Sequence, residues 1–548
     1  MTATHLAQVW QFYLPSGQFK NLHLSSSLLI AFVAMIESTP SDRRWRRAAY
    51  LMLALVALIP ALYIHLEYRA LVEERTFGPA PADIAVGALL VLLTFVAAWL
   101  QWGATIPAIG ILGLLYGYFG ALMPGDVLFH AGLGFERLVG YASIPNFQGA
   151  LGALTELSAG TIFVFMIFAG LLKSTGGIDF IMGAASAIGG RWRSGPAQMA
   201  VISSGLMGMI SGSTVANVAS TGAVTIPMMR RVGFRPTFAG AVEAVASTGG
   251  QFTPPVMGLT AFLIAGITGI SYTTIALAAI YSALIYYGYL MVAVHQHTLR
   301  FGIDAGAAAP ETRLQDLALR YWHLLVAVAV LVYFLIIQMP PALAALYSVA
   351  AIVALEALRA LWVGRRAPMA ALHDTLIRIV RGFDDGARSG ALLAVIIAVI
   401  GIFVDVLIVT GFAQKLSFAM LNLAAGKLWA LLLICAFACL AFGIGMPTPA
   451  AYILVALLGA PALVDLGVPL LAAHLFVFYF ANMSALTPPV AVASLVASRI
   501  AETSYWRTSF EAVHLGLPGF LLPFIFVARP ELLLLQGTAL EQMAVAVV

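Results

Sequence analysis

The sequence predicts an all-α polytopic membrane protein built on inverted repeats, and three observations lead to this fold class. Hydrophobic residues fill 61% of the 548 positions, charged residues fill 9%, and the mean hydropathy is +0.97. Apolar stretches near the roughly 20 residues that cross a membrane recur along the chain. Two long segments are interrupted by Gly, Ser, Thr and Pro, and their interruptions recur in register. No stretch is long enough for a soluble domain.

Apolar windows set the expected helices in chain order. They lie near residues 28–39, 48–66, 84–100, 104–123, 154–172, 237–268, 271–294, 320–338, 342–363, 389–412, 469–497 and 512–528. Polar stretches divide them into a four-helix module at 1–124, a first repeat at 125–300, a linker with inter-repeat helices at 301–388 and a second repeat at 389–548.

Charge and cysteine content exclude other classes of protein. Lys and Arg exceed Asp and Glu by 28 to 24, which fits basic cytoplasmic loops and gives no reason to expect a nucleic-acid partner. The Arg43–Arg47 and Arg365–Arg381 stretches are the topology anchors. Cys435 and Cys439 have no acid or His beside them, so we expect buried thiols and no metal cofactor.

Two segments are too long and too polar for one crossing. Gly195–Arg231 contains Ile210-Ser-Gly-Ser-Thr-Val-Ala-Asn217, and Gly426–Asp465 contains Ile444-Gly-Met-Pro-Thr-Pro-Ala450. A helix that enters, turns at a small-residue tip and leaves on the same side explains both, if the exposed backbone faces protein or a cavity. We therefore expect two re-entrant hairpins.

A broken helix is expected after each hairpin. Phe252-Thr-Pro-Pro-Val256 and Leu486-Thr-Pro-Pro-Val490 hold consecutive prolines, which cannot continue a helix because each lacks an N–H donor. The number of residues from Thr214 to the first Thr-Pro-Pro equals the number from Thr448 to the second. Adding one constant to the residue numbers of the first copy aligns it with the second copy without a gap. This regular spacing indicates an internal duplication.

Flanking charges predict that the two copies are inverted. Arg191 and Arg193 precede the first hairpin, and further arginines follow it at positions 230, 231 and 235. The second hairpin has Lys427 before it and no basic residue between Pro461 and Pro469. By the positive-inside rule, the hairpins enter from opposite faces. Inverted repeats with discontinuous helices point to the midplane binding site of a transporter.

A broken helix presents both backbone charges at one place, because its last carbonyls carry partial negative charge and the next N–H groups partial positive charge. The carbonyls, with hydroxyls nearby, suit a small hard cation such as sodium; the candidate hydroxyls are Ser211, Ser213, Thr214, Thr253, Thr448, Ser484 and Thr487. The half-helix N-termini would bind a carboxylate; the candidate residues are Ser213, Thr214, Asn217, Thr448 and Pro449. The alternative is that these small residues only allow close helix packing.

Two acids interrupt apolar runs. Glu243 precedes the first Thr-Pro-Pro, and Asp405 lies in Ile402-Phe-Val-Asp405. Ionisable groups at that depth are functional candidates. Two interpretations of Glu243 are open. It has a function, as a proton carrier or as an acid that organises the site, or it lies near the membrane surface and extends its carboxylate there. The same two interpretations apply to Asp405.

The motifs Ser211-Gly-Ser-Thr-Val-Ala-Asn217 and Gly240–Met257 (GAVEAVASTGGQFTPPVM) resemble the large membrane subunit of tripartite ATP-independent periplasmic (TRAP) transporters. The resemblance covers most of Gly125–Val548, and residues 1–124 are similar to the small subunit. The chain therefore resembles a fused permease, closest to the branch served by TAXI-type binding proteins.

The resemblance implies a multi-pass inner-membrane symporter that is not an enzyme and works by an elevator movement. It implies import of a small organic anion delivered by a periplasmic TAXI-type binding protein and coupled to sodium, or instead to protons. Sodium sites at the tips and breaks would map onto Ser211, Ser213, Thr214, Gly249, Thr253, Pro254, Gly445, Thr448, Ser484 and Thr487. The alternatives are a carboxylate carrier without a binding protein, a membrane-embedded enzyme and a scaffold.

Overall fold

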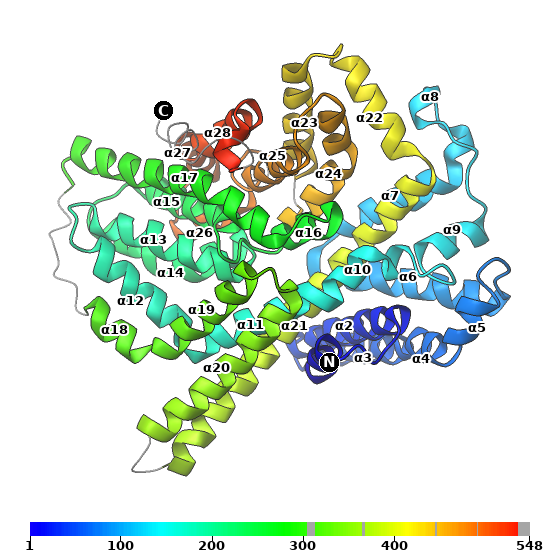
Figure 1. The fold of residues 1–548 in the computed structure, drawn as a ribbon, viewed down its shortest axis with the longest axis horizontal. Coiled ribbons are helices and arrows are strands. Elements are labelled where there is room, and N and C mark those ends of the chain that lie inside the picture. Colours follow the sequence, from blue (N-terminus) through cyan, green and yellow to red (C-terminus); the bar gives the residue numbers. More distant parts are fainter. Residues whose placement is uncertain (304–312, 364–367, 444–445, 490, 535–548) are drawn as a thin grey trace. The chain divides into compact units, whose positions relative to one another are not determined.

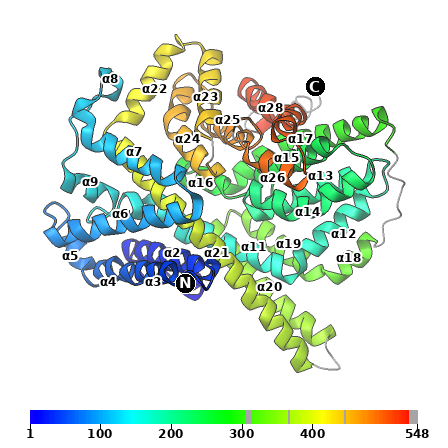
Figure 2. The same cartoon turned by 180° about the vertical axis from the view of Figure 1, so that it is seen from behind.

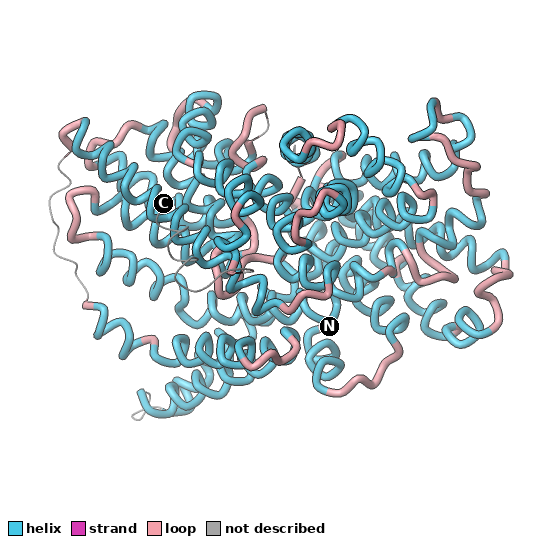
Figure 3. The backbone as a smooth tube through the Cα atoms, turned by 45° about the horizontal axis from the view of Figure 1, so that its top comes forward, coloured by secondary structure: helices cyan, strands magenta, loops and turns pink. Residues whose placement is uncertain are grey.

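The computed structural model describes residues 1–548 except 304–312, 364–367, 444–445, 490 and 535–548. Helices and loops make up the described residues, with no strand among them (Figure 3). Ten helical stretches of that part are long and apolar enough to cross a membrane. The predicted all-α polytopic fold is confirmed.

Contact density divides the chain into two compact units. The first unit combines Met1–Leu171 with Pro340–Ala419, and the second combines Leu172–Met339 with Met420–Val548. This is a division by packing, and the division by repeats at 1–124, 125–300, 301–388 and 389–548 stays a prediction.

The first unit contains the N-terminal helices and two long helices from the middle of the sequence (Figure 1). Its helices are α1 (Thr2–Trp10), α2 (Ser16–Ser38), α3 (Arg44–Val56), α4 (Leu58–Leu66), α5 (Tyr68–Glu73), α6 (Pro81–Trp102), α7 (Thr105–Phe119), α8 (Gly125–Leu128), α9 (Phe135–Ala142), α10 (Ala153–Leu157), α11 (Phe163–Leu172), α20 (Pro341–Val363) and α21 (Pro368–Val409). Helix α22 (Phe412–Leu423) begins in this unit and ends in the other.

Helix α21 organises the first unit. At about 1.5 Å per residue, its 42 residues span roughly 60 Å, twice the hydrocarbon thickness. Its glycines allow close contact with α11, since a Cβ at Gly386 would lie 2.6 Å from the Met166 carbonyl oxygen and one at Gly170 would meet Gly382. Small residues spaced by four are the usual means of tight helix packing in membranes.

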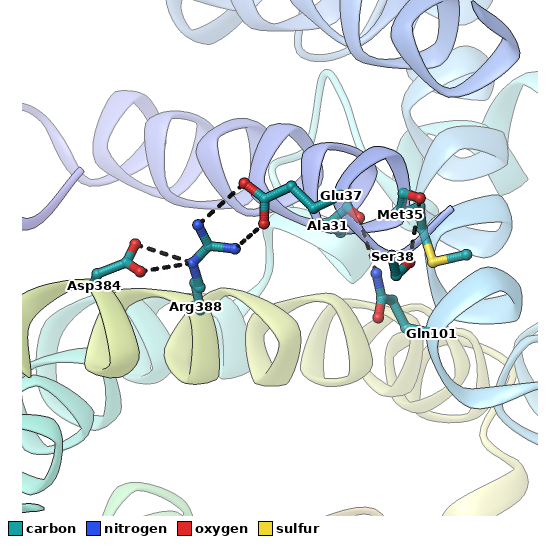
Figure 4. A network of polar contacts seen from close by, with 7 residues as sticks. All are labelled: Ala31, Met35, Glu37, Ser38, Gln101, Asp384 and Arg388. Carbon is teal, nitrogen blue, oxygen red and sulfur yellow. Dashed lines mark hydrogen bonds and ion pairs between the residues drawn. The ribbon is translucent and has the colours of Figure 1, made fainter. Parts of the chain in front are cut away.

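Polar contacts fix the end of α2 against α6 and α21 (Figure 4). Arg388 of α21 donates to both carboxylate oxygens of Glu37, and its Nε lies 2.9 Å from Asp384 Oδ2. Gln101 of α6 donates to the Ala31 carbonyl at 2.9 Å. Because the ion pairs are exposed, they set orientation more than stability.

Helix α1 is held by a buried pair of histidines. His5 Nε2 lies 2.8 Å from His23 Nδ1 on α2, and His23 Nε2 lies 3.0 Å from Ser158 Oγ. The His5 ring also contacts the rings of Phe19 and Phe163. Burial lowers the pKa of His5 to about 4, because a charged imidazolium would lose its hydration.

The second unit contains the first predicted hairpin, the two helices of the second, whose tip lies partly outside the described residues, and both predicted broken helices. Its helices are α12 (Ile178–Gly189), α13 (Gly195–Ser211), α14 (Thr214–Arg231), α15 (Pro236–Gly249), α16 (Thr260–Thr268), α17 (Tyr272–Arg300), α18 (Leu314–Arg320), α19 (Trp322–Ile336), α23 (Leu428–Phe442), α24 (Thr448–Asp465), α25 (Leu470–Met483), α26 (Val492–Ile500), α27 (Tyr505–Leu515) and α28 (Leu517–Ala528). Figure 2 shows them from behind.

The duplication is visible in the helix boundaries. Helices α22, α24 and α25 are as long as α12, α14 and α15 respectively, and each begins at the residue that the shift from Thr214 to Thr448 predicts. Contacts between the copies are reciprocal, because α15 packs on α26 while α25 packs on α16, and α14 contacts α26 while α24 contacts α16. Reciprocal contacts are what a two-fold relation between the copies produces.

Candidate functional site

The first hairpin turns at two residues between α13 and α14. Gly212 has a positive φ of 64°, which suits glycine, and a Cβ there would lie 3.1 Å from Leu259. Ser213 caps α14, since its Oγ accepts a hydrogen bond from the Ala216 N–H at 3.3 Å. The predicted tip is therefore a helix end followed at once by a helix start.

The first predicted break lies between α15 and α16. Helix α15 ends at Gly249, and α16 begins at Thr260. The Thr253 hydroxyl donates to the Gly249 carbonyl at 2.7 Å, and the Tyr272 hydroxyl lies within hydrogen-bond distance of the carbonyls of Pro255 and Val256, at 2.8 and 2.6 Å. The interruption is thus stabilised by the side chains of Thr253 and Tyr272. The role of Tyr272 was not predicted from the sequence.

The second break repeats this arrangement. Helix α25 ends at Met483, and the Thr487 hydroxyl donates to its carbonyl at 2.8 Å. Tyr505 donates to the Pro489 carbonyl at 2.7 Å, as Tyr272 does at the first break. The Pro254–Pro255 and Pro488–Pro489 peptide bonds are both cis. Both predicted broken helices are therefore confirmed, and a tyrosine at each serves the freed carbonyls.

Each hairpin packs against the break of its own repeat. A Cβ at Gly250 would lie 2.5 Å from Gly208 Cα, so α13 and the break touch through bare backbone. The Gln251 amide reaches the tip, and the orientation that satisfies both of its ends has nitrogen 3.1 Å from the Gly212 oxygen and oxygen 3.3 Å from the Ser213 nitrogen. Gln251 was missed because one amide in an apolar run has no periodic signal.

In the second repeat, Ser484 contacts α23 at Gly443. Its hydroxyl donates to the Ala481 carbonyl at 2.7 Å. Thr448 and the buried Pro449 begin α24, where proline is favoured because the first turn needs no N–H partner. The predicted ligand Gly445 lies outside the described residues.

The predicted oxygen ligands differ in their present hydrogen bonds. Thr214 Oγ1 is buried directly at the start of α14 and has no hydrogen-bond partner among the residues that the structure describes. The Ser211 hydroxyl donates to the Ser213 carbonyl at 3.3 Å. The Asn217 amide nitrogen donates to the Ser204 carbonyl at 2.7 Å inside the hairpin, so it does not face the tip. The roles predicted for these residues stay predictions.

Glu243 is completely buried on α15, and four hydroxyl groups contact its carboxylate. The reading of Glu243 as an acid that reaches the membrane surface is therefore wrong. Its Oε1 lies 2.6 Å from Ser204 Oγ, 2.6 Å from Thr221 Oγ1 and 3.2 Å from Ser247 Oγ, and its Oε2 lies 2.5 Å from Thr225 Oγ1. We call these four residues with Glu243 the hydroxyl cage.

Asp405 has a different setting in the first unit. Its Oδ2 accepts a hydrogen bond from the Gly149 N–H at 2.5 Å, next to the turn that precedes α10. Lys20 lies near the same turn and donates to the Phe147 carbonyl at 3.4 Å. Asp405 therefore binds the loop that contains Gly149 to α21. This structural role accounts for an acidic residue in an otherwise apolar helix.

Comparison with known proteins gives one family. The model of the family described as "Tripartite ATP-independent periplasmic transporter, DctM component" matches residues 85–539. The isethionate TRAP transporter permease protein DctMQ of Oleidesulfovibrio alaskensis is 26% identical over 413 residues, covering 73% of this chain and 62% of that protein.

Two further relatives match over short stretches. The uncharacterized protein y4mL of Sinorhizobium fredii is 34% identical over 90 residues, covering 16% of this chain, and YgiK of Salmonella typhimurium is 33% identical over 92, covering 17%. The chain spans about a fifth of the length of these two relatives. The crystal structure of the Alcanivorax borkumensis YdaH transporter aligns with a TM-score of 0.49 at 15% identity, covering 81% of this chain and 98% of that one.

Proposed function

This chain belongs to the DctM family of TRAP transporters, and on that premise we propose that it imports a small organic anion by using an ion gradient. The family consists of transporter permeases rather than enzymes, and the chain is a multi-pass protein of the inner membrane. We further propose that a periplasmic binding protein of the TAXI type delivers the anion.

One observation carries the proposal: two copies of a hairpin and a broken helix recur at a fixed offset in one compact unit. Each copy starts a helix of 18 residues, α14 or α24, directly after its tip. Helix N-termini attract carboxylates and other anions through their free N–H groups. The anion site proposed here comprises Ser213, Thr214, Asn217, Thr448 and Pro449. The Thr214 hydroxyl, which has no hydrogen-bond partner within the described part of the chain, supports it, whereas the Asn217 amide would have to leave its bond inside the hairpin.

The class of substrate is supported by a relative. The DctMQ protein is named for isethionate, a small organic anion. We propose an anion of that size for this chain, such as a carboxylate or keto acid.

Sodium binding at the tips and breaks is a proposal with a chemical basis. The Thr253 and Thr487 hydroxyls each donate their proton to a helix carbonyl, so their oxygen lone pairs are left for a cation. The proposed ligands remain Ser211, Ser213, Thr214, Gly249, Thr253, Pro254, Gly445, Thr448, Ser484 and Thr487.

An elevator movement is likewise proposed. The helices of both hairpins and both breaks fall in the second compact unit, together with α17 and α28. An elevator needs its binding site inside a body that moves as a whole, and a compact unit holding all four elements meets this need.

The test is transport by the full chain in liposomes. We expect uptake of a radiolabelled mixture of dicarboxylates, keto acids, amino acids and acidic sugars only when an ion gradient and purified TAXI-type binding protein are both present. Uptake without binding protein would instead support the carboxylate carrier that needs none. Absence of uptake under sodium and pH gradients alike, with several such binding proteins, would contradict the proposed function.

A further inference from the structure

We propose that Glu243 is a proton-binding site of this transporter and that the hydroxyl cage serves both protonation states of its carboxyl group. The inference rests on the proposed function, because it names a coupling ion for the first repeat. It concerns residues deeper in the hairpin than the tip and is independent of the sodium ligands proposed there.

The cage joins three helices that the hairpin and the break bring together. Ser204 comes from α13, Thr221 and Thr225 come from successive turns of α14, and Ser247 lies one turn after Glu243 on α15. A Cβ at Gly222 would lie 3.0 Å from Glu243 Cγ, so the side chain is also packed tightly along its stem. The carboxyl group therefore has a fixed position.

The ionised carboxylate has hydroxyl donors at both oxygens in this position, three at Oε1 and one at Oε2. Each hydroxyl has one proton to donate, and a carboxylate offers about four acceptor sites. Ser204, Thr221 and Ser247 reach Oε1, and Thr225 reaches Oε2. Four donors therefore stabilise the negative charge without a basic residue.

The protonated carboxyl is equally well accommodated. A proton on Oε2 is donated to Thr225 Oγ1, 2.5 Å away, and Thr225 turns its own proton to the Thr221 carbonyl at 3.1 Å. Thr221 has a similar second acceptor, the Asn217 carbonyl at 2.8 Å. One proton is added and hydroxyl protons rotate, so no buried polar group loses its partner.

The oxygen spacing favours a proton over a metal cation in the cage. When two oxygen atoms bind the same hard cation, each at about 2.3–2.6 Å and with an angle near 90° at the cation, the two oxygens lie roughly 3.3–3.7 Å from each other. The 2.5 and 2.6 Å contacts of Glu243 are shorter, because the oxygens touch each other directly. A cation would have to push the three helices apart.

The elements packed against α15 provide no cation for Glu243. Tyr286 and Tyr287 of α17 donate to the Val245 and Ala246 carbonyls, and His297 stacks on Phe238. Helix α13 has no ionisable residue. The other ionisable groups on these elements are Arg230 and Arg231 of α14, Arg235 before α15, Tyr272, Tyr281, Tyr289, His295 and Arg300 of α17, Arg499 of α26, and Tyr505, Arg507, Glu511 and His514 of α27. Within the described residues, none of them forms an ion pair or hydrogen bond with Glu243.

The second repeat shows that packing alone does not require the cage. When the two copies are aligned with Thr214 opposite Thr448, the positions equivalent to the five cage residues hold small or apolar residues: Ala438, Val455, Gly459, Val477 and Ala481. Helices α24 and α25 nevertheless have the boundaries that the same shift predicts from α14 and α15. The acid and its four hydroxyls therefore occur in one copy as a set, which indicates a function of that copy.

Infrared difference spectra between acidic and alkaline pH test the site without any substrate. The full chain in liposomes should show a protonated carboxyl band that disappears on alkalinisation. Glu243→Gln should lack this band, and Glu511→Gln should keep it as the matched control. Thr225→Val should move the conversion to higher pH, because both forms lose a partner at Oε2 but the hydrogen bond to the charged form is the stronger one, and Thr225→Ser should restore it. An unchanged band in Glu243→Gln, or identical titrations for both Thr225 variants, would overturn the proposal.

Transport separates this inference from the proposed function. With the radiolabelled acid mixture and binding protein, Glu243→Gln should lose accumulation driven by a pH gradient, down to background, but keep exchange of internal for external substrate. Accumulation at the wild-type level would refute the proton site and leave the transporter assignment intact. If Glu243→Gln also loses exchange, Glu243 is needed for anion binding or for helix packing, and this result would contradict its role in proton coupling. If the wild type itself takes up nothing, the proposed function fails, and the infrared spectra still decide whether Glu243 binds a proton.

Discussion

Replacing Tyr272 by Phe tests whether tyrosine hydroxyls hold the two helix breaks open. Phe keeps the ring that stacks on Phe262 at 4.4 Å but loses the hydroxyl that serves the carbonyls of Pro255 and Val256. Tyr272 is buried and the residues that carry the two carbonyls are half-buried, so water has less access to the lost donor's place than at an exposed bond. A carbonyl that loses its partner away from water costs about 1–3 kcal/mol.

The second repeat provides the matched control. Tyr505 makes the equivalent bond to the Pro489 carbonyl at an exposed position. Water can replace its hydroxyl in Tyr505→Phe, so we expect a cost below about 1 kcal/mol. The difference between the variants isolates the effect of burial on the same chemical group.

Amide hydrogen exchange measures the cost locally. The Met257 N–H donates to the Thr253 carbonyl at 3.2 Å, and the Ala491 N–H donates to the Thr487 carbonyl at the same distance. If the break opens as a local unit, about 1–3 kcal/mol corresponds to about 5- to 150-fold faster exchange at Met257 in Tyr272→Phe. Equal acceleration at Met257 and Ala491 in the respective variants, or none at Met257, would refute the reasoning.

Three further predictions test separate parts of the structure. Thr253→Val and Thr487→Val should raise the sodium concentration for half-maximal uptake in liposomes, and an unchanged requirement in both would remove these ligands. Gly250→Ala should lower the melting temperature of the purified protein, since its Cβ would lie 2.5 Å from α13 backbone, at a cost of about 1–3 kcal/mol. Gly288→Ala should be neutral or stabilising, because among the described residues a Cβ there would meet nothing within 4 Å beyond the adjoining backbone of its own helix. Protonation of His5, whose pKa burial lowers to about 4, favours the undocked α1, so the protection of the α1 amides relative to their intrinsic exchange rates should decrease as pH falls from about 6.5 towards 4. His5→Gln should remove this pH dependence.

The helical architecture could be read from the sequence because it depends on local chemistry. Consecutive prolines end a helix wherever they occur, so both breaks were placed correctly at Thr253 and Thr487. The constant shift between the two copies was visible in the letters alone and reappears in the boundaries of α24 and α25. The first tip at Ser211–Ser213 was also predicted, because glycine and a serine cap mark a helix end and start.

The contents of the candidate site were less predictable. Glu243 was singled out as an acid in an apolar run, but its function was left open between two readings. Its partners lie 39, 22 and 18 residues earlier in the chain, at Ser204, Thr221 and Thr225. Hydroxyl residues four apart on α14 were a signal for one polar face, yet nothing in the spacing indicated which helix that face meets.

The sequence by itself determined that the chain is helical, lies in a membrane and contains two interrupted copies of one segment, since hydropathy, proline and glycine act over a few residues. Tertiary structure alone decided that Gln251 reaches the hairpin tip and that Tyr272 serves the freed carbonyls at the break. It also decided that four hydroxyls surround Glu243. These contacts depend on how packed helices are rotated about their axes, and that rotation is fixed by many side chains together rather than by any local motif.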